Sequence, residues 1–342
     1  MTSTEKVVNK NFFTPNEVWR IDDSLEEPIE HARYNMNQKD PEALLHELQE
    51  QVRTAENGVK FAVLRGQNPA EYSNREALVI FNPYANAATP NMLIRCEFIR
   101  EVAQTCGVRD EAGKLKPVIM LASPAMGGSK IKLTREERKI VSSGNLGPVA
   151  SELLHAISVS EFGKVALLGY SQGADMALAG AKEATSSYLD LSGFSVGDPA
   201  GIKKRTLLGL ADDFSKAAPD LGRAIERSGV KAQSAYRDKT PAIVAGFLPN
   251  AIRSWNISQA MTHESFESGM QQLLDEDRLD KITIAYGSKS SVSIPEAIEP
   301  ILERLQQTDS KGIITSVRVD GATHAWDNQL PLLAKLYMRA AR

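Results

Sequence analysis

A serine between two glycines is the residue in this sequence best placed to act as a nucleophile. Ser171 is the centre of the pentapeptide Gly-Tyr-Ser-Gln-Gly, which spans residues 169–173. An apolar run at 165–168 predicts a buried strand of a parallel sheet before it, and the alanines at 174–181 predict a closely packed helix after it. A strand that turns so sharply into a helix strains its central residue, and flanking glycines remove the side chains that would clash. The pattern predicts a nucleophile elbow, with an ordinary glycine-flanked turn as the alternative.

A serine hydroxyl needs a base within hydrogen-bond reach, because at neutral pH the alcohol is a poor nucleophile. Of the five histidines, only His324 follows a predicted last strand, in the glycine-containing loop at 320–326, and comes after Ser171 in the chain. A serine that precedes its histidine is the chain order expected with a nucleophile elbow. We therefore predict His324 as the general base, with His263 as the fallback.

The oxyanion formed during acyl transfer needs two backbone N–H donors. One should be Gln172, the residue directly after the nucleophile at the start of the predicted helix. The other should come from the loop after the strand at 77–81, where Pro83 has no N–H and Tyr84 is the first choice. Ala85 is the alternative donor, and a rigid loop in which Tyr84 only lines a pocket is the non-catalytic interpretation.

Strands alternate with helices over most of the chain. Strands are predicted at 59–64, 77–81, 117–121, 165–168, 189–196, 281–286 and 313–319. Helices are predicted at about 92–102, 146–158, 295–306 and 326–342, and after Gly173. This alternation predicts an α/β fold with a doubly wound, mostly parallel sheet, in which ligands bind at the carboxyl ends of the strands. Ser171 lies at such an end.

Three regions of the chain differ in pattern. Residues 1–58 are predicted to be an N-terminal extension with one helix packed on the core, and residues 59–201 with 279–342 are predicted to form the core itself. Residues 202–278 are helical and poor in strands, which predicts an inserted helical cap. Breaks in these helices are expected at Pro219, Gly229, Pro241 and Pro249.

Within the N-terminal region, residues up to about 40 are expected to be irregular. Asp40 as N-cap and Pro41 at the first helical position then open a helix, which Asn57 and Gly58 close.

The motifs together resemble the α/β-hydrolase superfamily, in particular its cap-bearing esterase, lipase and carbon–carbon hydrolase branches. The similarity runs from about residue 76 to the C-terminus and rests on four segments: GYSQG at 169–173, SPAMGGS at 123–129, YGSKSSVSIP at 286–295 and DGATHAW at 320–326. The first segment also looks like that of cutinases. The resemblance implies an α/β-hydrolase fold with its lid at 202–278, and it implies no metal and no organic cofactor.

The third member expected beside the serine and the histidine is an acidic residue, and here the sequence departs from the family pattern. When Tyr286-Gly287 is aligned with the family's motif, Ser290 stands where the acid usually is, and no Asp or Glu follows before Glu296. Asp198 ends the preceding predicted strand, a position at which some lipases of the superfamily carry their acid. We predict Asp198 as the acid, and a site in which Ser290 replaces the carboxylate, or an acid elsewhere, stays open.

The composition gives no reason to expect a polyanionic partner. Lys and Arg number 40 against 43 Asp and Glu, so the formal net charge of −3 provides no broad field for nucleic acid or an anionic membrane. Because no signal peptide and no run of about 18 apolar residues is found, we expect a cytoplasmic protein without a membrane span. Cys96 and Cys106 do not match a zinc pair and are predicted to be buried free thiols.

The leading functional hypothesis is a serine hydrolase that acylates Ser171 and cleaves the carboxylic ester of a small molecule. A carbon–carbon or thioester hydrolase would use the same residues. The alternative from another class is a non-catalytic binding or scaffold protein on a hydrolase fold, because the usual acid after Gly287 is absent.

Overall fold

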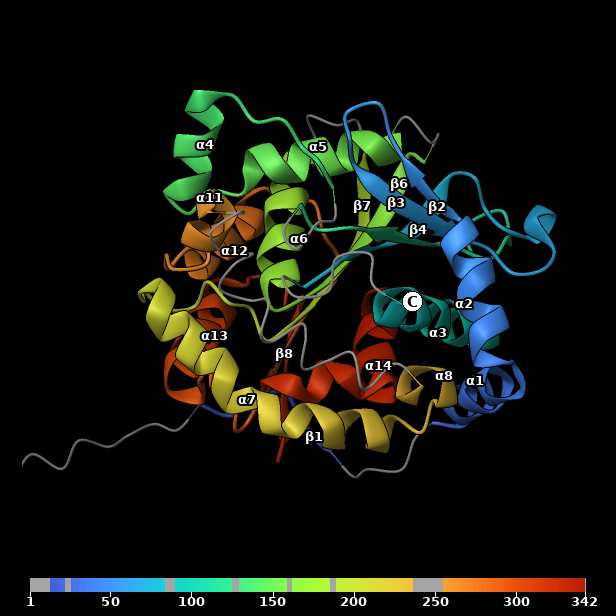
Figure 1. Cartoon of the computed structure of the whole chain (residues 1–342). Coiled ribbons are helices and arrows are strands. Elements are labelled where there is room, and N and C mark those ends of the chain that lie inside the picture. The colour runs from blue at the N-terminus through green and yellow to red at the C-terminus, as the bar shows by residue number, and fades with distance from the viewer. Residues whose placement is uncertain are drawn as a thin grey trace, which may run out of the picture.

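One sheet runs through the centre of the chain, and helices pack against both of its faces (Figure 1). The computed structural model describes residues 13–21, 26–83, 90–124, 129–158, 162–184, 189–235 and 255–341. Each face of the sheet has its own hydrophobic core, so the described residues form three layers.

The sheet has nine strands in the order β1-β9-β8-β7-β6-β4-β5-β3-β2. Their bounds are β1 Glu17–Arg20, β2 Val52–Thr54, β3 Lys60–Leu64, β4 Glu76–Phe81, β5 Val118–Leu121, β6 Lys164–Tyr170, β7 Asp190–Gly197, β8 Ile282–Gly287 and β9 Ile314–Asp320. Neighbouring strands are parallel except at one end, where β3 is antiparallel to both β5 and β2. The predicted α/β fold with a mostly parallel sheet is confirmed.

Helices α1, α2, α3 and α14 cover one face of the sheet, and α5, α6, α12 and α13 cover the other. The helices are α1 Glu27–Gln38, α2 Pro41–Glu50, α3 Pro90–Thr105, α4 Arg135–Ser142, α5 Gly147–Ser158, α6 Gln172–Glu183, α7 Leu207–Ser228, α8 Lys231–Ser234, α11 Trp255–Ala260, α12 Phe266–Asp275, α13 Pro295–Thr308 and α14 Leu330–Ala341, with short 3₁₀ helices η1 Pro69–Glu71 and η4 His324–Asn328.

The side chains of the central strand β6 alternate between the two cores. Val165 and Leu167 contribute to the core that contains α5 and α6, whereas Ala166, Leu168 and Tyr170 contribute to the core that contains α3 and α14. Successive side chains of a strand point to opposite faces, so a strand buried on both sides is apolar along its whole length. This is why the sequence predicts β6 well.

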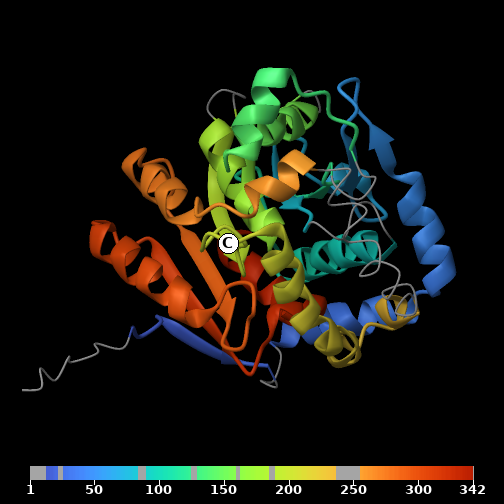
Figure 2. The same cartoon turned by 60° about the vertical axis from the view of Figure 1, so that its left-hand side comes forward.

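Where the structure describes the first 40 residues, at 13–21 and 26–40, much of the chain is regular rather than irregular as its sequence predicts. β1 pairs parallel with β9 at the edge of the sheet, where Figure 2 shows it beside the C-terminal strands, and α1 packs against α3. Trp19 is the only buried residue of β1, and α1 buries Ile29, Ala32 and Met36 among charged and polar residues. So few apolar positions give a weak periodic signal, and the prediction of an irregular segment was wrong.

The second helix begins where the sequence predicts and ends earlier. Asp40 caps α2 through its side chain and Pro41 is its first residue, but the helix ends at Glu50. The next residues form β2, and a turn through Asn57 and Gly58 joins β2 to β3 as a hairpin. The predicted helix end was wrong because Asn-Gly closes a hairpin as readily as a helix.

Residues 202–278 contribute the described helices α7, α8, α11 and α12. α7 packs against η4 and α14, α11 against α4, and α12 against α6 and α13. α7 continues through Pro219 and ends before Gly229, which adopts a left-handed φ of 65°. The break predicted at Pro219 was wrong because this proline is exposed, so water can bond to the carbonyl that loses its N–H partner. Pro241 and Pro249 lie outside the described residues.

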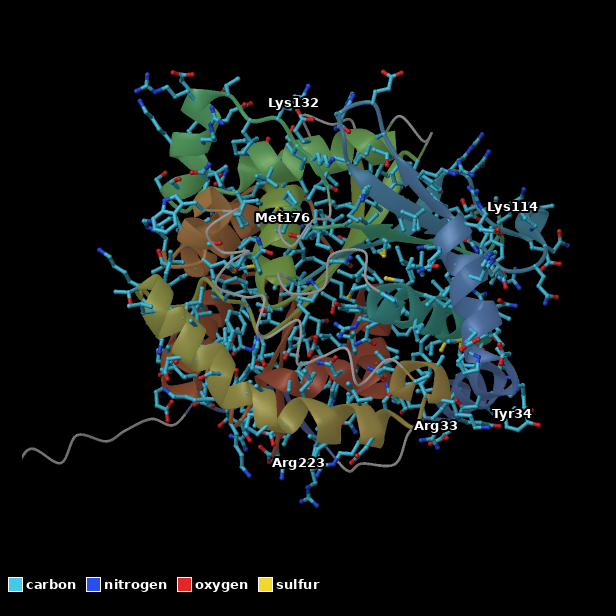
Figure 3. All side chains as sticks on the ribbon, in the orientation of Figure 1. Arg33, Tyr34, Lys114, Lys132, Met176 and Arg223 are labelled. Atoms are coloured by element: carbon cyan, nitrogen blue, oxygen red, sulfur yellow. The ribbon has the colours of Figure 1, made fainter. Side chains whose placement is uncertain are left out.

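The outer surface is charged. Lys114, Lys132 and Arg223 are exposed and point away from the body, whereas Met176 of α6 is buried (Figure 3). None of the described helices combines the length and the apolar character that crossing a membrane requires.

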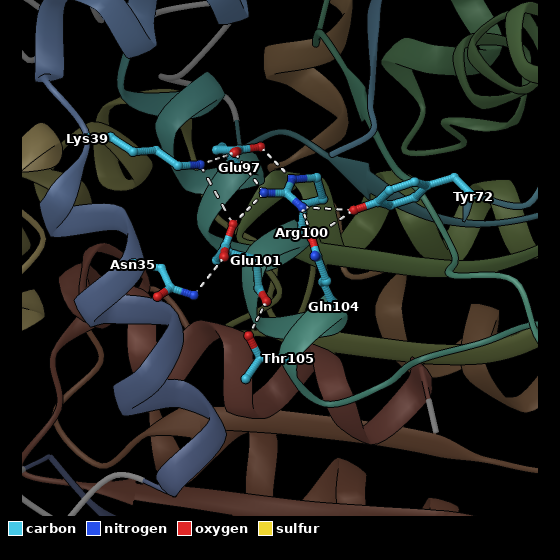
Figure 4. A network of polar contacts seen from close by, with 8 residues as sticks. All are labelled: Asn35, Lys39, Tyr72, Glu97, Arg100, Glu101, Gln104 and Thr105. Carbon is cyan, nitrogen blue, oxygen red and sulfur yellow. Dashed lines mark hydrogen bonds and ion pairs between the residues drawn. The ribbon is translucent and has the colours of Figure 1, made fainter. Parts of the chain in front are cut away.

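A buried polar network holds α3, the helix that follows the predicted oxyanion loop. The guanidinium of Arg100 donates to the carboxylates of Glu97 and Glu101 and to the hydroxyl of Tyr72 (Figure 4). Lys39, which follows α1, pairs with Glu97 at 2.9 Å. Burial of an unpaired charge costs free energy, and these pairings reduce that cost for the charged residues on the buried side of α3. The pair with Lys39 also joins α3 to the end of α1.

Both cysteines are free thiols. Cys96 is buried on α3, where burial raises the pKa of its thiol to about 12. Cys106 lies just after α3 and is half-buried. The prediction of a buried thiol is confirmed for Cys96, whereas Cys106 is more exposed than predicted.

A second buried ion pair joins α3 to η4, the short helix that begins with His324. Arg95 Nη1 lies 2.7 Å from Asp327 Oδ2, and Arg95 Nη2 donates to Asn328 Oδ1 at 3.1 Å. Both charged side chains are at least nine-tenths buried. The pair therefore fixes the segment that carries His324 against the body of the protein.

We expect Arg95→Met to destabilise the protein by about 3–5 kcal/mol, because it leaves the buried carboxylate of Asp327 without its partner. The double variant Arg95→Met with Asp327→Asn removes both charges and should recover part of this loss. Urea unfolding of the purified variants measures both effects, with Lys216→Ala, which breaks an exposed ion pair on α7, as the control that should keep the wild-type midpoint. Equal midpoints for Arg95→Met and Lys216→Ala would contradict the prediction.

Candidate active site

Ser171 stands on a tight turn between β6 and α6. Its backbone adopts φ 56° and ψ −127°, an unfavourable conformation for a residue with a Cβ atom. A Cβ atom at Gly169 would lie 2.2 Å from the carbonyl oxygen of Gly173, and one at Gly173 would lie 2.2 Å from that of Phe81. Both glycines are therefore required by close backbone packing, and the serine side chain occupies the apex of the turn.

His324 lies directly beside this serine. Its Nε2 atom is 2.9 Å from Ser171 Oγ, and the imidazole is buried. His324 follows the last strand, β9, as the first residue of η4. The fallback histidine, His263, makes a different contact, since its Nε2 lies 3.0 Å from the carbonyl oxygen of Ser142.

Asp198 lies on the other side of the imidazole. Its Oδ2 atom is 3.3 Å from His324 Nδ1, close enough for an ion pair with a protonated histidine, although Nδ1 has no aligned hydrogen bond within the described residues. The carboxylate is fully buried, Oδ1 accepts the N–H of Gly287 at 2.9 Å, and Oδ2 accepts the hydroxyl of Tyr170 at 2.7 Å. Asp198 also has a positive φ, 43°, which turns its side chain at the end of β7.

Ser290, the other candidate for this position, is used elsewhere. Its hydroxyl oxygen accepts the N–H of Ser293 at 3.0 Å in the turn before α13. The hydroxyl of Ser293 in turn donates to the carbonyl oxygen of Pro199, the residue after Asp198. Ser290 thus supports the loop that carries Asp198.

Of the two predicted oxyanion donors, the structure describes one. Gln172 is the first residue of α6, and the N–H groups of a helix's first turn have no acceptor within the helix. Its N–H can therefore donate to an oxygen atom next to Ser171. Tyr84 and its alternative Ala85 lie outside the described residues.

Aromatic side chains that the sequence analysis did not single out surround the imidazole. The ring of Phe214, on α7, has its centroid 5.3 Å from that of His324, and the ring of Tyr170 lies at 5.4 Å. Trp326 packs edge-on against Tyr170 at 5.1 Å. These contacts join segments far apart in the sequence, so no local pattern indicates them, although Tyr170 itself lies within the predicted elbow.

Two buried charged residues hold the loop after Asp198. Asp175, on α6, accepts the N–H of Gly201 at 3.0 and 3.1 Å with its two oxygens. Arg205 donates to the carbonyl oxygens of Ala200 and Val292 and pairs with Asp213 of α7 at 2.7 Å. The loop is therefore attached to the nucleophile's helix on one side and to α7 on the other.

Within the part of the chain that the structure describes, no three His, Cys, Asp or Glu side chains come close enough to hold a metal ion. Ser171, His324 and Asp198 place a hydroxyl, an imidazole and a carboxylate next to one another, and these groups can act as nucleophile, base and charge-stabilising carboxylate. Such an arrangement can transfer an acyl group through a covalent intermediate.

The chain combines a mostly parallel sheet with a sharp turn between β6 and α6. Ser171, Asp198 and His324 follow one another in that order along the chain and lie together at the turn. It is an α/β-hydrolase fold. The strand order around Ser171 places the ends of β6, β7 and β9 at one edge of the sheet, where this fold carries its reacting groups.

The sequence matches no family model and no curated protein. Among solved structures, the chain is similar to the naproxen esterase (carboxylesterase NP) of Bacillus subtilis, with 12% identity over 88% of this chain and 98% of the other and a TM-score of 0.47. It is also similar to a thermophilic esterase of Thermogutta terrifontis, with 15% identity, 83% and 94% coverage and a TM-score of 0.46. An esterase of Pyrococcus furiosus gives 10% identity, 87% and 94% coverage and a TM-score of 0.48. The roles proposed below rest on the geometry of this chain.

The stability of the loop after Asp198 should depend on pH through Asp175. Burial raises the pKa of this carboxyl to about 7, against the lowering effect of the N–H groups of Gly201 and Ala200 and of nearby Arg205. The folded state therefore holds the proton up to a higher pH than the unfolded state, and ionisation of Asp175 costs stability between about pH 4 and pH 7.

Asp175→Asn keeps an oxygen acceptor for Gly201 and cannot ionise. We expect its free energy of unfolding to rise relative to wild type by up to about 1.4 kcal/mol for each pH unit between pH 4 and 7. Urea unfolding at pH 4.5, 6 and 7.5 measures the difference. Asp175→Ala, which also loses the acceptor, should be the least stable of the three proteins at pH 4.5, and an Asn variant whose difference from wild type is constant with pH would contradict the prediction.

Proposed function

We propose that this protein is a serine hydrolase that cleaves a carboxylic ester of a small molecule through an acyl-enzyme on Ser171. The observation that carries the proposal is the 2.9 Å contact between Ser171 Oγ and His324 Nε2, made by a serine on a strained turn. A base at this distance can accept the hydroxyl proton as the oxygen attacks. Strained backbone of this kind is concentrated at functional sites.

The first half of the proposed reaction forms the acyl-enzyme. Ser171 Oγ attacks the ester carbonyl carbon while its proton moves to His324 Nε2, and the carbonyl oxygen becomes an oxyanion that accepts the N–H of Gln172. Tyr84 is the proposed second donor. The oxyanion then collapses, the bond to the alcohol oxygen breaks, and the alcohol leaves with the proton from His324.

The second half releases the acid. Water gives a proton to His324 Nε2 and attacks the acyl carbon. The second oxyanion then collapses, the bond between the acyl carbon and Ser171 Oγ breaks, and Oγ takes the proton back from His324. The carboxylic acid product leaves and the enzyme is restored. In both halves the imidazole becomes protonated and positively charged, and the buried carboxylate of Asp198, 3.3 Å from Nδ1, is proposed to stabilise that charge.

Asp198 also bears on the non-catalytic alternative. That hypothesis is motivated by the missing acid after Gly287, but a carboxylate reaches the imidazole from the end of β7 instead. A binding protein has no need for a fully buried carboxylate next to a serine–histidine pair. The geometry therefore favours the enzyme.

We further propose that residues 202–278 form the cap over a core of 59–201 and 279–342, with 1–58 packed on that core. α7 packs against η4, and its Phe214 contacts the imidazole of His324. Arg205 and Asp213 join the start of this segment to the loops after β7 and β8. A segment attached in this way can shape the substrate pocket and exclude water from the acyl-enzyme.

Ser171 should react covalently with a fluorophosphonate, because only an activated serine attacks this reagent. Ser171→Ala should abolish the labelling and reduce turnover of short p-nitrophenyl esters by about a million-fold. Intact-mass measurement and ester assays test both, with Ser195→Ala as a control serine on β7 whose hydroxyl donates to the backbone of α14 and should be dispensable for labelling. Labelling that persists in a folded Ser171→Ala protein refutes the proposal. A thioester substrate in the same assay separates the ester from the thioester hydrolase.

The role of Asp198 is tested by comparing Asp198→Asn with Ser290→Ala. The first should reduce turnover by about 10⁴-fold, as the equivalent change does in serine proteases, because an amide favours the wrong histidine tautomer and carries no charge. Ser290→Ala removes only a hydrogen-bond acceptor in a turn and should leave turnover within a few-fold of wild type. If the order of damage is reversed, Asp198 is not the acid.

A further inference from the structure

The hydroxyl of Tyr170 contacts two parts of the site at once. It lies 2.7 Å from Asp198 Oδ2 and 2.7 Å from the backbone carbonyl oxygen of His324. Tyr170 is the last residue of β6 and directly precedes Ser171. One hydroxyl thus lies between the aspartate at the end of β7 and the histidine segment after β9.

The surroundings of Tyr170 leave its ring little freedom. The ring is fully buried between the imidazole of His324 and the indole of Trp326. On β7, Gly197 makes room for it, since a Cβ atom there would lie 2.7 Å from Tyr170 Cδ2. The hydroxyl position is therefore fixed by packing, and the groups bonded to it are fixed in turn.

Tyr170 and His324 share one oxygen of the aspartate. Oδ1 of Asp198 is occupied by the N–H of Gly287, so Oδ2 serves both the tyrosine hydroxyl at 2.7 Å and the imidazole Nδ1 at 3.3 Å. A donor to a carboxylate stabilises its charge and reduces its attraction for other donors. The tyrosine is the closer of the two partners.

We propose that Tyr170 is a positioning residue, whose hydroxyl directs its one proton between Asp198 Oδ2 and the carbonyl oxygen of His324 and so limits how strongly the aspartate interacts with the imidazole. This inference rests on the proposed function, because the interaction matters for the reaction through His324. Burial, followed by the negative charges of Asp198 and Asp327, raises the pKa of Tyr170 far above its ordinary range. The hydroxyl therefore remains a donor at every pH at which the site works.

Two further carboxylates on the elements beside the imidazole are paired with arginines. Asp327, on η4 itself, is engaged by Arg95 of α3. From α7, the uncharged ring of Phe214 faces His324, and the carboxylate of the preceding residue, Asp213, is paired with Arg205. Among the residues that the structure describes, Asp198 is thus the carboxylate paired with the imidazole, and a change in its hydrogen bonding should be visible in the titration of His324.

The test compares Tyr170→Phe with Tyr286→Phe. Tyr286 is a matched control on β8, a buried tyrosine whose hydroxyl donates to Glu299 Oε1 at 2.8 Å. In Tyr170→Phe the aspartate keeps one partner at Oδ2, so the histidine should hold its proton to a higher pH, and the acidic limb of the kcat/KM profile should move up by about 0.5–1 pH unit. We expect kcat to fall about 3- to 10-fold with KM within twofold, because the substrate contacts are intact.

NMR titration of the histidine ring signals compares the same two variants without any turnover. The variant His324→Gln assigns the resonance of His324. A shift in Tyr170→Phe that Tyr286→Phe lacks supports the inference. An unchanged His324 midpoint in a folded Tyr170→Phe protein, or equal shifts in both variants, overturns it, whether or not the protein hydrolyses esters. Absence of labelling in the wild-type protein instead refutes the proposed function alone.

Should Tyr170→Phe fail to fold, uniform replacement of tyrosine by 3-fluorotyrosine provides the second measurement. The fluorinated hydroxyl is a stronger donor and should move the His324 midpoint to lower pH in both the parent and the Tyr286→Phe background. A midpoint that does not move, or that moves only in the parent, overturns the inference.

Discussion

The packing of the end of β4 against the start of α6 is the constraint on which the site depends. A side chain at Gly173 would collide with the carbonyl oxygen of Phe81, so α6 can begin here only because this position is glycine. The helix start in turn forces Ser171 to φ 56°. Such strain persists only where the surroundings fix it, and here the two hydrophobic cores on either side of β6 do so. Ser171 is held by the same apolar burial that stabilises the sheet.

Burial of charge is the second requirement, because Asp198 and His324 are both removed from water. A buried carboxylate is tolerated only when its oxygens are hydrogen-bonded, and Asp198 has the N–H of Gly287 and the hydroxyl of Tyr170 in addition to the imidazole. The donors come from strands on both sides of β7. The sheet register therefore decides whether this carboxylate can be buried at all.

The sequence predicts the features that neighbouring residues determine, and it leaves open those that depend on how distant strands pair in the sheet. The turn at Ser171 and the central strands are visible because glycine spacing and continuous apolar runs need no knowledge of neighbours. β1 was missed, since one buried Trp19 gives no period, and its pairing with β9 joins residues about 300 positions apart. The choice between Asp198 and Ser290, and the contact of Tyr170 with Asp198, likewise follow from strands brought together by the sheet.

The carboxylate beside the imidazole comes from Asp198, directly after β7. Because β7 is the direct neighbour of β6, the hydroxyl of Tyr170 at the end of β6 reaches Asp198 across one strand spacing. The loop after β8 contains no Asp or Glu before Glu296. Its serines instead support the acid's own loop, since Ser290 accepts the N–H of Ser293, and Ser293 donates to Pro199. Ser290, at the position where the sequence comparison expects an acid, thus belongs to the hydrogen bonds that support the loop carrying Asp198.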